Sequence, residues 1–195
     1  METEKIVADY FAHITEDVWE RAAKIKLIIT DIDGVMTDGG IIYDDNKLEF
    51  KKFSVKDGLI VYHLRKSGLM VGAITGRESY VVQNRCEELK FDFHYHGVKN
   101  KGKKFNEVLE TLELQAEEVA YIGDDLIDLP ILARVGLAVV SNDALEYVKP
   151  IAHYVSRFKG GEGVFREVGD LLLHSNAQLV PLIETLSQKE DDKKQ

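Results

Sequence analysis

The chain has 195 residues, of which 45% are hydrophobic and 30% charged, with a formal net charge of −9 and a sequence pI of about 5.2. This length allows one domain with a substantial core, and the composition is typical of a soluble globular protein. The negative charge disfavours nucleic acid as a partner, because nucleic-acid-binding surfaces are basic. No apolar run approaches the roughly 18 residues of a membrane span, so we expect no membrane partner either.

The ends of the chain differ from its middle. We expect residues 1–13 to form a loose arm, residues 14–175 one domain, and residues 176–195 a tail whose polar end, SQKEDDKKQ, is disordered. The acidic N-terminus lacks the basic-then-apolar pattern of a signal peptide, and the single cysteine, Cys86, cannot form an internal disulfide. These features favour the cytoplasm.

Between the ends, short apolar runs alternate with helix-length segments. The expected helices are residues 15–23, 57–66, 78–89, 103–113, 126–133, 143–148 and 163–173, and the expected strands are residues 25–30, 69–74, 91–95, 119–122, 136–140 and 152–156. Strands that alternate with helices predict βαβ units, and continuous apolar strands suit burial on both faces. The sequence therefore predicts an α/β fold with a doubly wound, Rossmann-like parallel sheet.

Several residues predict where these elements begin and end. Gly68 and Gly136 follow two expected helices as C-terminal stops, and Asp57 and Asp143 are candidate N-caps. Residues 40–53 interrupt the alternation, because two short β-like runs flank a turn of Asp-Asp-Asn. We expect a β-hairpin inserted after the first strand.

Polar side chains gather after the expected strands. They are Asp31 and Asp33 after the first strand, Thr75, Gly76 and Arg77 after the second, Lys101 after the third, and Asp124, Asp125 and Asp128 after the fourth. The carboxyl ends of parallel strands meet at one edge of a sheet, so these groups should converge there. Carboxylates with few protein ligands suit Mg²⁺, while hydroxyl, ammonium and backbone N–H groups suit a phosphate. One carboxylate could attack phosphorus, and Asp33 could then move protons.

The segments DIDGVMTDG, ITGR, Lys101 and GDDLIDLP resemble, in order and spacing, the four motifs of the haloacid dehalogenase superfamily of phosphatases. The resemblance implies that Asp31 is the nucleophile and Asp33 the general acid and base. It implies that the Asp31 side chain, the Asp33 carbonyl and Asp124 hold Mg²⁺ directly. Asp125 would contact the ion indirectly, through another ligand or a water molecule. Thr75, Gly76 and Lys101 would bind the phosphoryl group.

A second resemblance covers residues 14–174 and includes KKFSVKDG, ITGRESYVVQNRC and GGEGVFREVGDLLL. These segments are similar to the phosphatases that act on 3-deoxy-D-manno-octulosonate (KDO) 8-phosphate in lipopolysaccharide biosynthesis. Related enzymes that act on the nine-carbon KDN 9-phosphate tend to carry an acid where this chain has Arg77, so the resemblance favours KDO 8-phosphate and keeps KDN 9-phosphate as the alternative. Arg77, Arg85 and Arg166 are our candidates for binding the carboxylate of such a sugar acid.

The chain has no room between its motifs for the cap domain that many members of this superfamily carry. The hairpin region instead offers Ile41, Ile42, Tyr43, Phe50 and Phe53, which is more apolar surface than a free hairpin should expose. We expect the hairpin to pack on neighbouring subunits that cover each other's sites. The resemblance implies a homotetramer.

Other interpretations stay open. A receiver-like signalling domain also has an acidic Mg²⁺ site with a phosphorylated aspartate, but it lacks an acid/base residue two positions later. A non-catalytic tetramerisation module is a further alternative. Asp125 could equally be a helix cap, His94 and His96 are more simply structural than metal ligands, and Cys86 is most simply a small buried residue.

Overall fold

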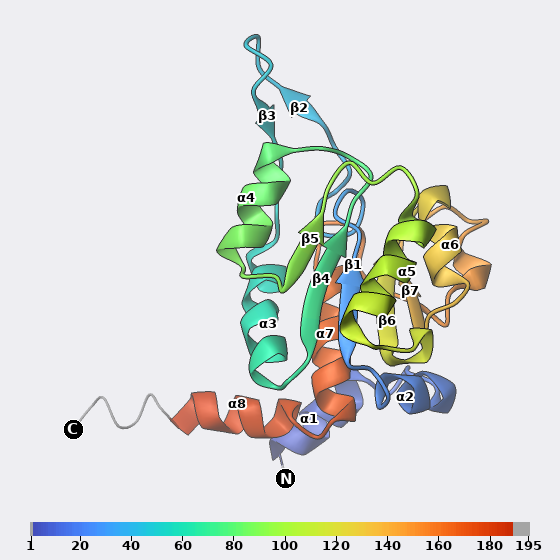
Figure 1. Ribbon diagram of the computed structural model, residues 1–195. Coiled ribbons are helices and arrows are strands. Elements are labelled where there is room, and N and C mark those ends of the chain that lie inside the picture. Colours follow the sequence, from blue (N-terminus) through green and yellow to red (C-terminus); the bar gives the residue numbers. More distant parts are fainter. Residues whose placement is uncertain (1, 189–195) are drawn as a thin grey trace.

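The structure is a computed structural model that describes residues 2–188. Six strands of the described chain form one parallel sheet in the order β5-β4-β1-β6-β7-β8 (Figure 1). They are β1 (Leu27–Thr30), β4 (Met70–Ile74), β5 (Phe93–Tyr95), β6 (Val119–Gly123), β7 (Leu137–Val140) and β8 (Tyr154–Val155). The order runs outward in both directions from β1, so the prediction of a doubly wound parallel sheet is confirmed.

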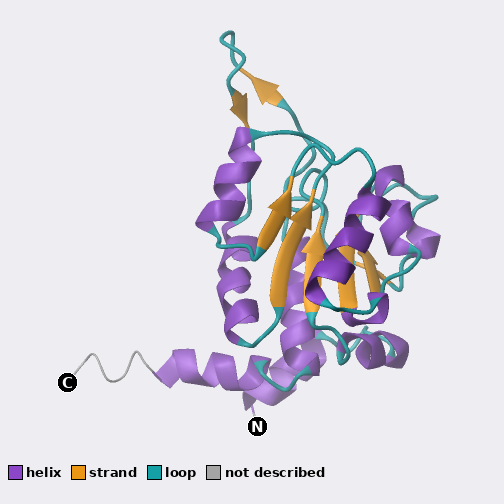
Figure 2. Cartoon of the chain, viewed as in Figure 1, coloured by secondary structure: helices purple, strands orange, loops and turns teal. Residues whose placement is uncertain are grey.

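Helices cover both faces of this sheet (Figure 2). They are α1 (Glu2–Tyr10), α2 (Glu16–Ala22), α3 (Val55–Lys66), α4 (Tyr80–Glu88), α5 (Lys101–Leu112), α6 (Leu129–Leu132), α7 (Val164–Ser175) and α8 (Leu179–Gln188), with short 3-10 turns at Ala116–Glu118 (η1), Leu126–Asp128 (η2) and Lys149–Ile151 (η3). Alternate residues of each central strand enter opposite cores. Ile28 packs in the core beneath α2, α3, α4 and α7, whereas Leu27 and Ile29 pack in the core beneath α5 and α6.

The inserted hairpin consists of β2 (Ile42–Tyr43) and β3 (Glu49–Phe50). It pairs antiparallel in the register Ile42↔Phe50 and projects beyond the carboxyl end of the sheet (Figure 1). Most of its apolar side chains are exposed, as expected, and Leu48 is exposed with them. Phe53 differs, because it is partly buried against the core below the hairpin.

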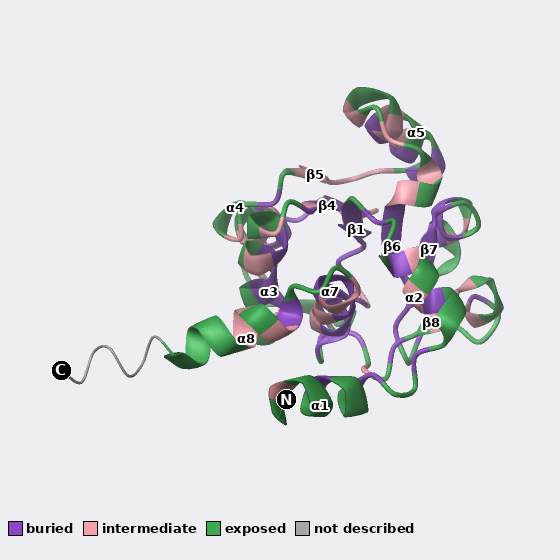
Figure 3. Cartoon of the chain, turned by 90° about the horizontal axis from the view of Figure 1, so that it is seen from below, coloured by how far each residue is buried: buried purple, intermediate pink, exposed green. Residues whose placement is uncertain are grey.

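Both ends of the described chain contain helices where the sequence predicted none. Helix α1 lies within the expected loose arm and buries Val7, and Phe11 is buried just after it. Helix α8 occupies most of the expected tail and buries Leu179. Figure 3, which views the molecule from below, shows that both helices are otherwise largely exposed. The expectation of disorder concerns mainly residues 189–195, which lie outside the described residues.

The expected helix at residues 143–148 is wrong. Successive turns replace it, including hydrogen bonds from the Ala144 N–H to the Ser141 carbonyl and from the Leu145 N–H to the Asp124 carbonyl. Asp143 is therefore no N-cap, and its carboxylate accepts the Gly160 N–H at 3.0 Å. The expected helix at residues 126–133 is divided into η2 and α6, since Pro130 opens a new helix at its first turn.

Two further boundary predictions have mixed outcomes. Helix α3 begins at Val55 with Ser54 as its N-cap, so Asp57 lies inside the helix, where it is buried and accepts the Arg166 N–H at 2.7 Å. Gly68 follows α3 at a φ of +92°, as a C-terminal stop should. Gly136 is required for a different reason, because a Cβ there would lie 2.0 Å from the Glu117 carbonyl oxygen.

Candidate active site

A cleft of about 320 Å³ opens at the carboxyl ends of β1, β4 and β6. The residues that line it are Asp31, Asp33, Thr75, Gly76, Arg77, Val98, Lys99, Asp124, Asp125 and Ile127. Each follows a strand or lies in the loop after one. The structure therefore brings together seven of the residues that the sequence predicted, and Lys101 contacts them from beneath the cleft.

Asp31 stands at the end of the central strand and is only 3% exposed. One carboxylate oxygen accepts the Ile32 N–H at 2.7 Å, and the other lies 2.8 Å from the Lys101 ammonium. Burial raises the pKa of Asp31 to about 7, although Lys101 works against this shift. Each oxygen keeps a lone pair that can face the cleft.

Asp128 fixes the position of Lys101. One oxygen of this fully buried carboxylate accepts the Lys101 ammonium at 2.7 Å and the Tyr121 hydroxyl at 2.6 Å. The other oxygen accepts the backbone N–H groups of Asp124 and Asp125 at 3.0 and 3.2 Å. Burial disfavours the charged form of Lys101, but the two aspartates outweigh it and raise its pKa. Asp128 thus holds both the lysine and the loop after β6.

Among the described residues, no cation forms an ion pair with the Asp124 carboxylate. Burial, together with Asp31 and Asp128, raises its pKa to about 8. Its carboxylate lies against the backbone of Gly34, where a Cβ would be 2.1 Å from the Asp124 Oδ2. A glycine at position 34 therefore lets the two catalytic loops meet. Asp125 lies at the cleft edge and caps η2 through the Leu126 N–H.

Asp33 lies among cations from the hairpin side. The Lys51 ammonium, on a side chain with no exposed surface, forms an ion pair with its Oδ1. The Arg77 Nε lies 3.7 Å from its Oδ2, and the Arg77 Nη2 donates to Glu49 and to the Tyr43 hydroxyl at 2.9 and 3.1 Å. The hairpin thus supplies side chains that contact two of the residues lining the cleft, Asp33 and Arg77.

The loop after β4 is held by the strand beside it. The Thr75 N–H donates to the Tyr95 carbonyl at 2.9 Å, and the Gly97 N–H donates to the Arg77 carbonyl at 3.1 Å. Thr75 is almost fully buried, and Gly76 lines the cleft next to Ile127. This arrangement holds a hydroxyl and a backbone segment at the edge of the cleft, where phosphoryl oxygens could bind.

The glycine-rich segment near the C-terminus packs beneath the first catalytic loop. A Cβ on Gly160 would lie 2.3 Å from the Gly34 carbonyl oxygen, and one on Gly161 would lie 2.8 Å from the Asp38 backbone nitrogen. Gly161 also has a φ of +73°, which favours glycine. This segment therefore supports the loop that carries Asp31.

Two of the predicted substrate-binding arginines lie outside the cleft of their own chain. Arg85 forms an ion pair with Glu88 at 2.8 Å and lies over the Phe53 ring. Arg166 forms an ion pair with Asp170 at 2.7 Å and lines an apolar cavity between α1, α3, α7 and α8. Neither arginine lines the cleft in the single chain.

The carboxylate cluster has the charge and donor atoms for a divalent cation. Oxygens of Asp31, Asp124 and Asp128 lie within 4.8 Å of one another. Three carboxylates and the single ammonium of Lys101 leave two negative charges if all are ionised. Since Asp128 is saturated by hydrogen bonds, Asp31 and Asp124 are the side chains free to bind a hard cation such as Mg²⁺.

Sequence reasoning missed the residues that position these groups. Lys51 and Glu49 belong to the hairpin, and their place in the cleft depends on how the hairpin folds back. Asp128 was counted among the acids of this edge but had no assigned role, and Tyr121 is a buried strand residue. One signal in the sequence could have indicated a structural role for Asp128. It lies three positions after Asp125, which is the spacing of the capping box that the structure shows.

Comparison with known proteins agrees with this geometry. The sequence pattern of a family described as haloacid dehalogenase-like hydrolase matches residues 94–168. The 3-deoxy-D-manno-octulosonate 8-phosphate phosphatase of Yersinia pestis is 44% identical over 169 residues, which are 87% of this chain and 90% of that protein. The crystal structure of the Yersinia pestis enzyme has a TM-score of 0.84 at 45% identity, covering 85% of this chain and 90% of that one.

A further solved structure is similar at lower identity. The Moraxella catarrhalis 3-deoxy-D-manno-octulosonate 8-phosphate phosphatase, determined in complex with magnesium, phosphate and KDO, has a TM-score of 0.86 at 32% identity. The match covers 88% of this chain and 99% of that chain. Sequence and fold therefore agree over most of both proteins. This chain belongs to the haloacid dehalogenase-like hydrolases and, within them, to the family of the 3-deoxy-D-manno-octulosonate 8-phosphate phosphatases.

Proposed function

We propose that this protein hydrolyses KDO 8-phosphate to KDO and phosphate, as a step of lipopolysaccharide biosynthesis. The observation that carries this proposal is the 44% identity to the Yersinia pestis enzyme over 87% of the chain, joined to a complete acidic cleft. A relative with the same fold holds magnesium, phosphate and KDO together, which supports a phosphorylated sugar acid as the substrate.

Mg²⁺ is the cofactor that the donor set fits. The carboxylates of Asp31 and Asp124 and the main-chain carbonyl of Asp33 would hold it, with Asp125 at the edge. When bound, the ion neutralises the cluster and lowers the repulsion between Asp31 and an anionic phosphate. The pKa values of Asp31 and Asp124 are raised, first by burial and then by neighbouring carboxylates, and a bound cation would offset both effects.

In the first half-reaction, the Asp31 carboxylate attacks phosphorus and forms an aspartyl-phosphate while the bond to the sugar oxygen breaks. Asp33 gives a proton to the departing sugar oxygen. Lys101 and Thr75, which lie around Asp31, bind phosphoryl oxygens and stabilise the charge that develops on them.

In the second half-reaction, the Asp33 carboxylate takes a proton from a water molecule that attacks the aspartyl-phosphate. The Lys51 ammonium and the Arg77 guanidinium contact the Asp33 carboxylate and hold it in place beside the cleft. Hydrolysis returns Asp31 to its free carboxylate and releases phosphate. Asp33 thus acts first as an acid and then as a base, two residues from the nucleophile.

The test is a phosphate-release assay with Mg²⁺ on KDO 8-phosphate, KDN 9-phosphate and common hexose phosphates. We expect the highest kcat/KM on KDO 8-phosphate. Equal values across the panel would retract this substrate and leave only the phosphatase class. A long-lived aspartyl-phosphate without turnover would favour the receiver-like domain instead, and no reaction with any ester would favour the non-catalytic tetramerisation module. Neither alternative is favoured by the relatives.

We further propose that the protein is a homotetramer in the cytoplasm. The exposed apolar side chains of the hairpin support assembly, because a hairpin at the edge of an open cleft gains a partner and covers the cleft at once. Arg77 is then the carboxylate-binding candidate within the cleft, and Arg85 or Arg166 could serve only a neighbouring subunit. No helix among residues 2–188 is long and apolar enough to cross a membrane.

A further inference from the structure

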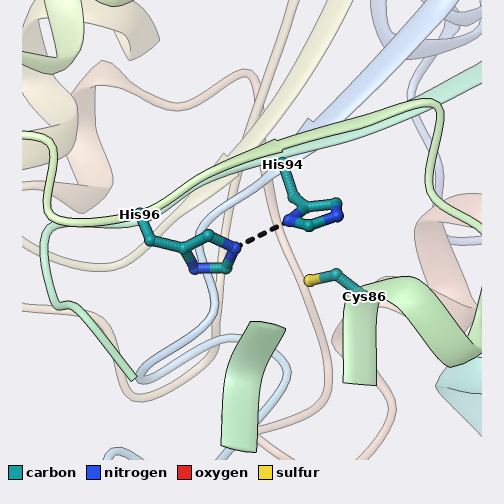
Figure 4. A group of neighbouring side chains, drawn as sticks. All are labelled: Cys86, His94 and His96. Carbon is teal, nitrogen blue, oxygen red and sulfur yellow. Dashed lines mark hydrogen bonds between the residues drawn. The ribbon is translucent and has the colours of Figure 1, made fainter. Parts of the chain in front are cut away.

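Three potential metal ligands meet where α4 packs on β5, away from the acidic cluster. His94 and His96 lie two residues apart on β5 and its extension, so their side chains share one face of the strand. Cys86, in the last turn of α4, points toward the same face (Figure 4). A ligand atom from each of the three residues lies within 4.8 Å of the others.

The spacing of these atoms is close to that of a tetrahedral metal site. The His94 Nδ1 and His96 Nε2 face each other at 2.8 Å, with the rings inclined at 66°. Zn–N and Zn–S bonds of about 2.0 and 2.3 Å require ligand atoms about 3.3 Å apart for two nitrogens and about 3.5 Å apart for nitrogen and sulfur. An ion would require the gap between the rings to widen by about 0.5 Å and the Cys86 sulfur, which lies within 4.8 Å of a nitrogen of each ring, to sit about 3.5 Å from each nitrogen.

The environment of the three side chains is partly prepared for an ion. Burial and the neighbouring His94 lower the pKa of His96. Its Nδ1 is buried without a hydrogen-bond partner among the described residues. Burial raises the pKa of the Cys86 thiol to about 12, so the thiol must release its proton to the solvent on binding.

We propose that Cys86, His94 and His96 form a binding site for one Zn²⁺-class transition-metal ion, with solvent in the fourth position. Sulfur and imidazole ligands select such ions and exclude Mg²⁺, which prefers oxygen. The site is thus chemically distinct from the carboxylate cluster of the cleft. The site is nevertheless connected to the cleft through the backbone. Tyr95 and Gly97 alternate with the two histidines, and both form hydrogen bonds with the loop after β4, which lines the cleft.

The test uses Co²⁺ as a spectroscopic probe on protein saturated with Mg²⁺. Cys86 is the only cysteine in the chain, so a thiolate-to-cobalt charge-transfer band can arise only from it. We expect this band to saturate at one Co²⁺ per chain and to disappear on addition of Zn²⁺. Absence of the band from folded protein at saturating Co²⁺ would overturn the proposal and leave a buried cysteine beside a histidine hydrogen bond.

Variants separate this site from other places where cobalt could bind. Cys86→Ser and Cys86→Ala should each abolish the band, and His96→Gln should weaken Co²⁺ binding at least about tenfold. Asp124→Asn, which alters the acidic cluster, and His13→Gln, which removes an exposed imidazole, should leave the band unchanged. Circular dichroism identifies which variants are folded. Unaltered Co²⁺ affinity in folded His96→Gln would contradict the three-ligand site.

Discussion

Asp31 and Asp128 are both buried aspartates that accept a hydrogen bond from Lys101, yet they differ in what remains free on each carboxylate. Both oxygens of Asp128 accept two hydrogen bonds each, whereas each oxygen of Asp31 has one protein contact. Asp31 can therefore reach a substrate, and Asp128 can act only through the groups that it holds. This difference leads to separate predictions.

Replacing Asp31 with Asn should lower kcat by at least about 10³-fold, because an amide cannot form the aspartyl-phosphate. The thermal unfolding midpoint should not fall, since the change removes a carboxylate that burial already disfavours. Asp38→Asn is the matched control, because Asp38 caps only the exposed turn at Gly40 and should keep full activity. Near-normal turnover by Asp31→Asn would refute the mechanism.

Replacing Asp128 with Asn should lower kcat/KM by about 10- to 100-fold, the usual effect of losing a group that orients a catalytic residue. An amide cannot accept on both atoms, so either Lys101 and Tyr121 or the loop after β6 loses its acceptor. Tyr121→Phe removes the hydrogen bond to Asp128 and the longer one, at 3.3 Å, from the Lys101 ammonium, but it keeps the ion pair of Lys101 with Asp128, so it should cost less. Steady-state kinetics measure kcat/KM for the two variants. An equal loss of kcat/KM in both would contradict this account.

At the scale of elements, the helix α3 contains a carboxylate that is poorly solvated. Asp57 accepts the Arg166 N–H, but its other oxygen is buried without a partner among the described residues. Burial raises the pKa of Asp57 to about 6 from an ordinary value near 3.8. The folded state therefore binds this proton more tightly than the unfolded state does.

The sign of the resulting pH effect follows from linkage. The stabilisation due to Asp57 is complete below pH 3.8 and is lost as the pH rises through about 6. Asp57→Asn keeps the acceptor for the Arg166 N–H and removes the titration. Between pH 4 and 6.5, urea unfolding should show the stability of the wild type falling relative to the variant by on the order of 2 kcal/mol. A constant difference would contradict the raised pKa.

The sequence predicted most of the elements, and the exceptions have physical causes. The strands were found because burial on both faces makes them continuously apolar, as in LIIT and VAYIG. Helices α1 and α8 were missed because the ends of the chain were interpreted from their polar composition, although Leu179, Val180, Leu182, Ile183 and Leu186 recur at helical spacing in α8, which packs on α1. The segment at 143–148 has a helical composition, but long-range hydrogen bonds to Asp124 and Asp143 hold it in turns.

The candidate site was predictable to a similar degree. The strand-end acids Asp31, Asp33 and Asp124 could be placed, since topology brings the carboxyl ends of parallel strands together. The ion pair of Lys51 with Asp33 could not, because it depends on the fold of an insertion. The positions of Arg85 and Arg166 outside the cleft could not be predicted either. They depend on how the helices α4 and α7 are rotated about their axes.

At the scale of the whole molecule, the proposed tetramer would link the hairpin to activity. Ile42 and Phe50 form a cross-strand pair and are 59% and 49% exposed in the single chain. Changing both to Ser should shift the proteins from tetramers towards monomers in light scattering at micromolar concentration, and should lower kcat/KM as the cleft opens to water. Tyr62→Ser on α3 is a control with comparable exposure. A wild-type monomer would rule out the tetramer.

The crowding of acids at the ends of β1 and β6 has a consequence for how the protein is handled. The burial of Asp31 and Asp124, together with the repulsion among the acids, disfavours the ionised cluster in the absence of a cation. Because Mg²⁺ would bind this cluster only in the folded chain, a free concentration of 100 times its Kd would add about 2.7 kcal/mol to the unfolding free energy. Purification with a chelator would then lower the unfolding free energy and expose more of the chain to proteolysis. A low yield in such buffers would result from loss of the ion at the acidic cluster and not from a poorly packed core.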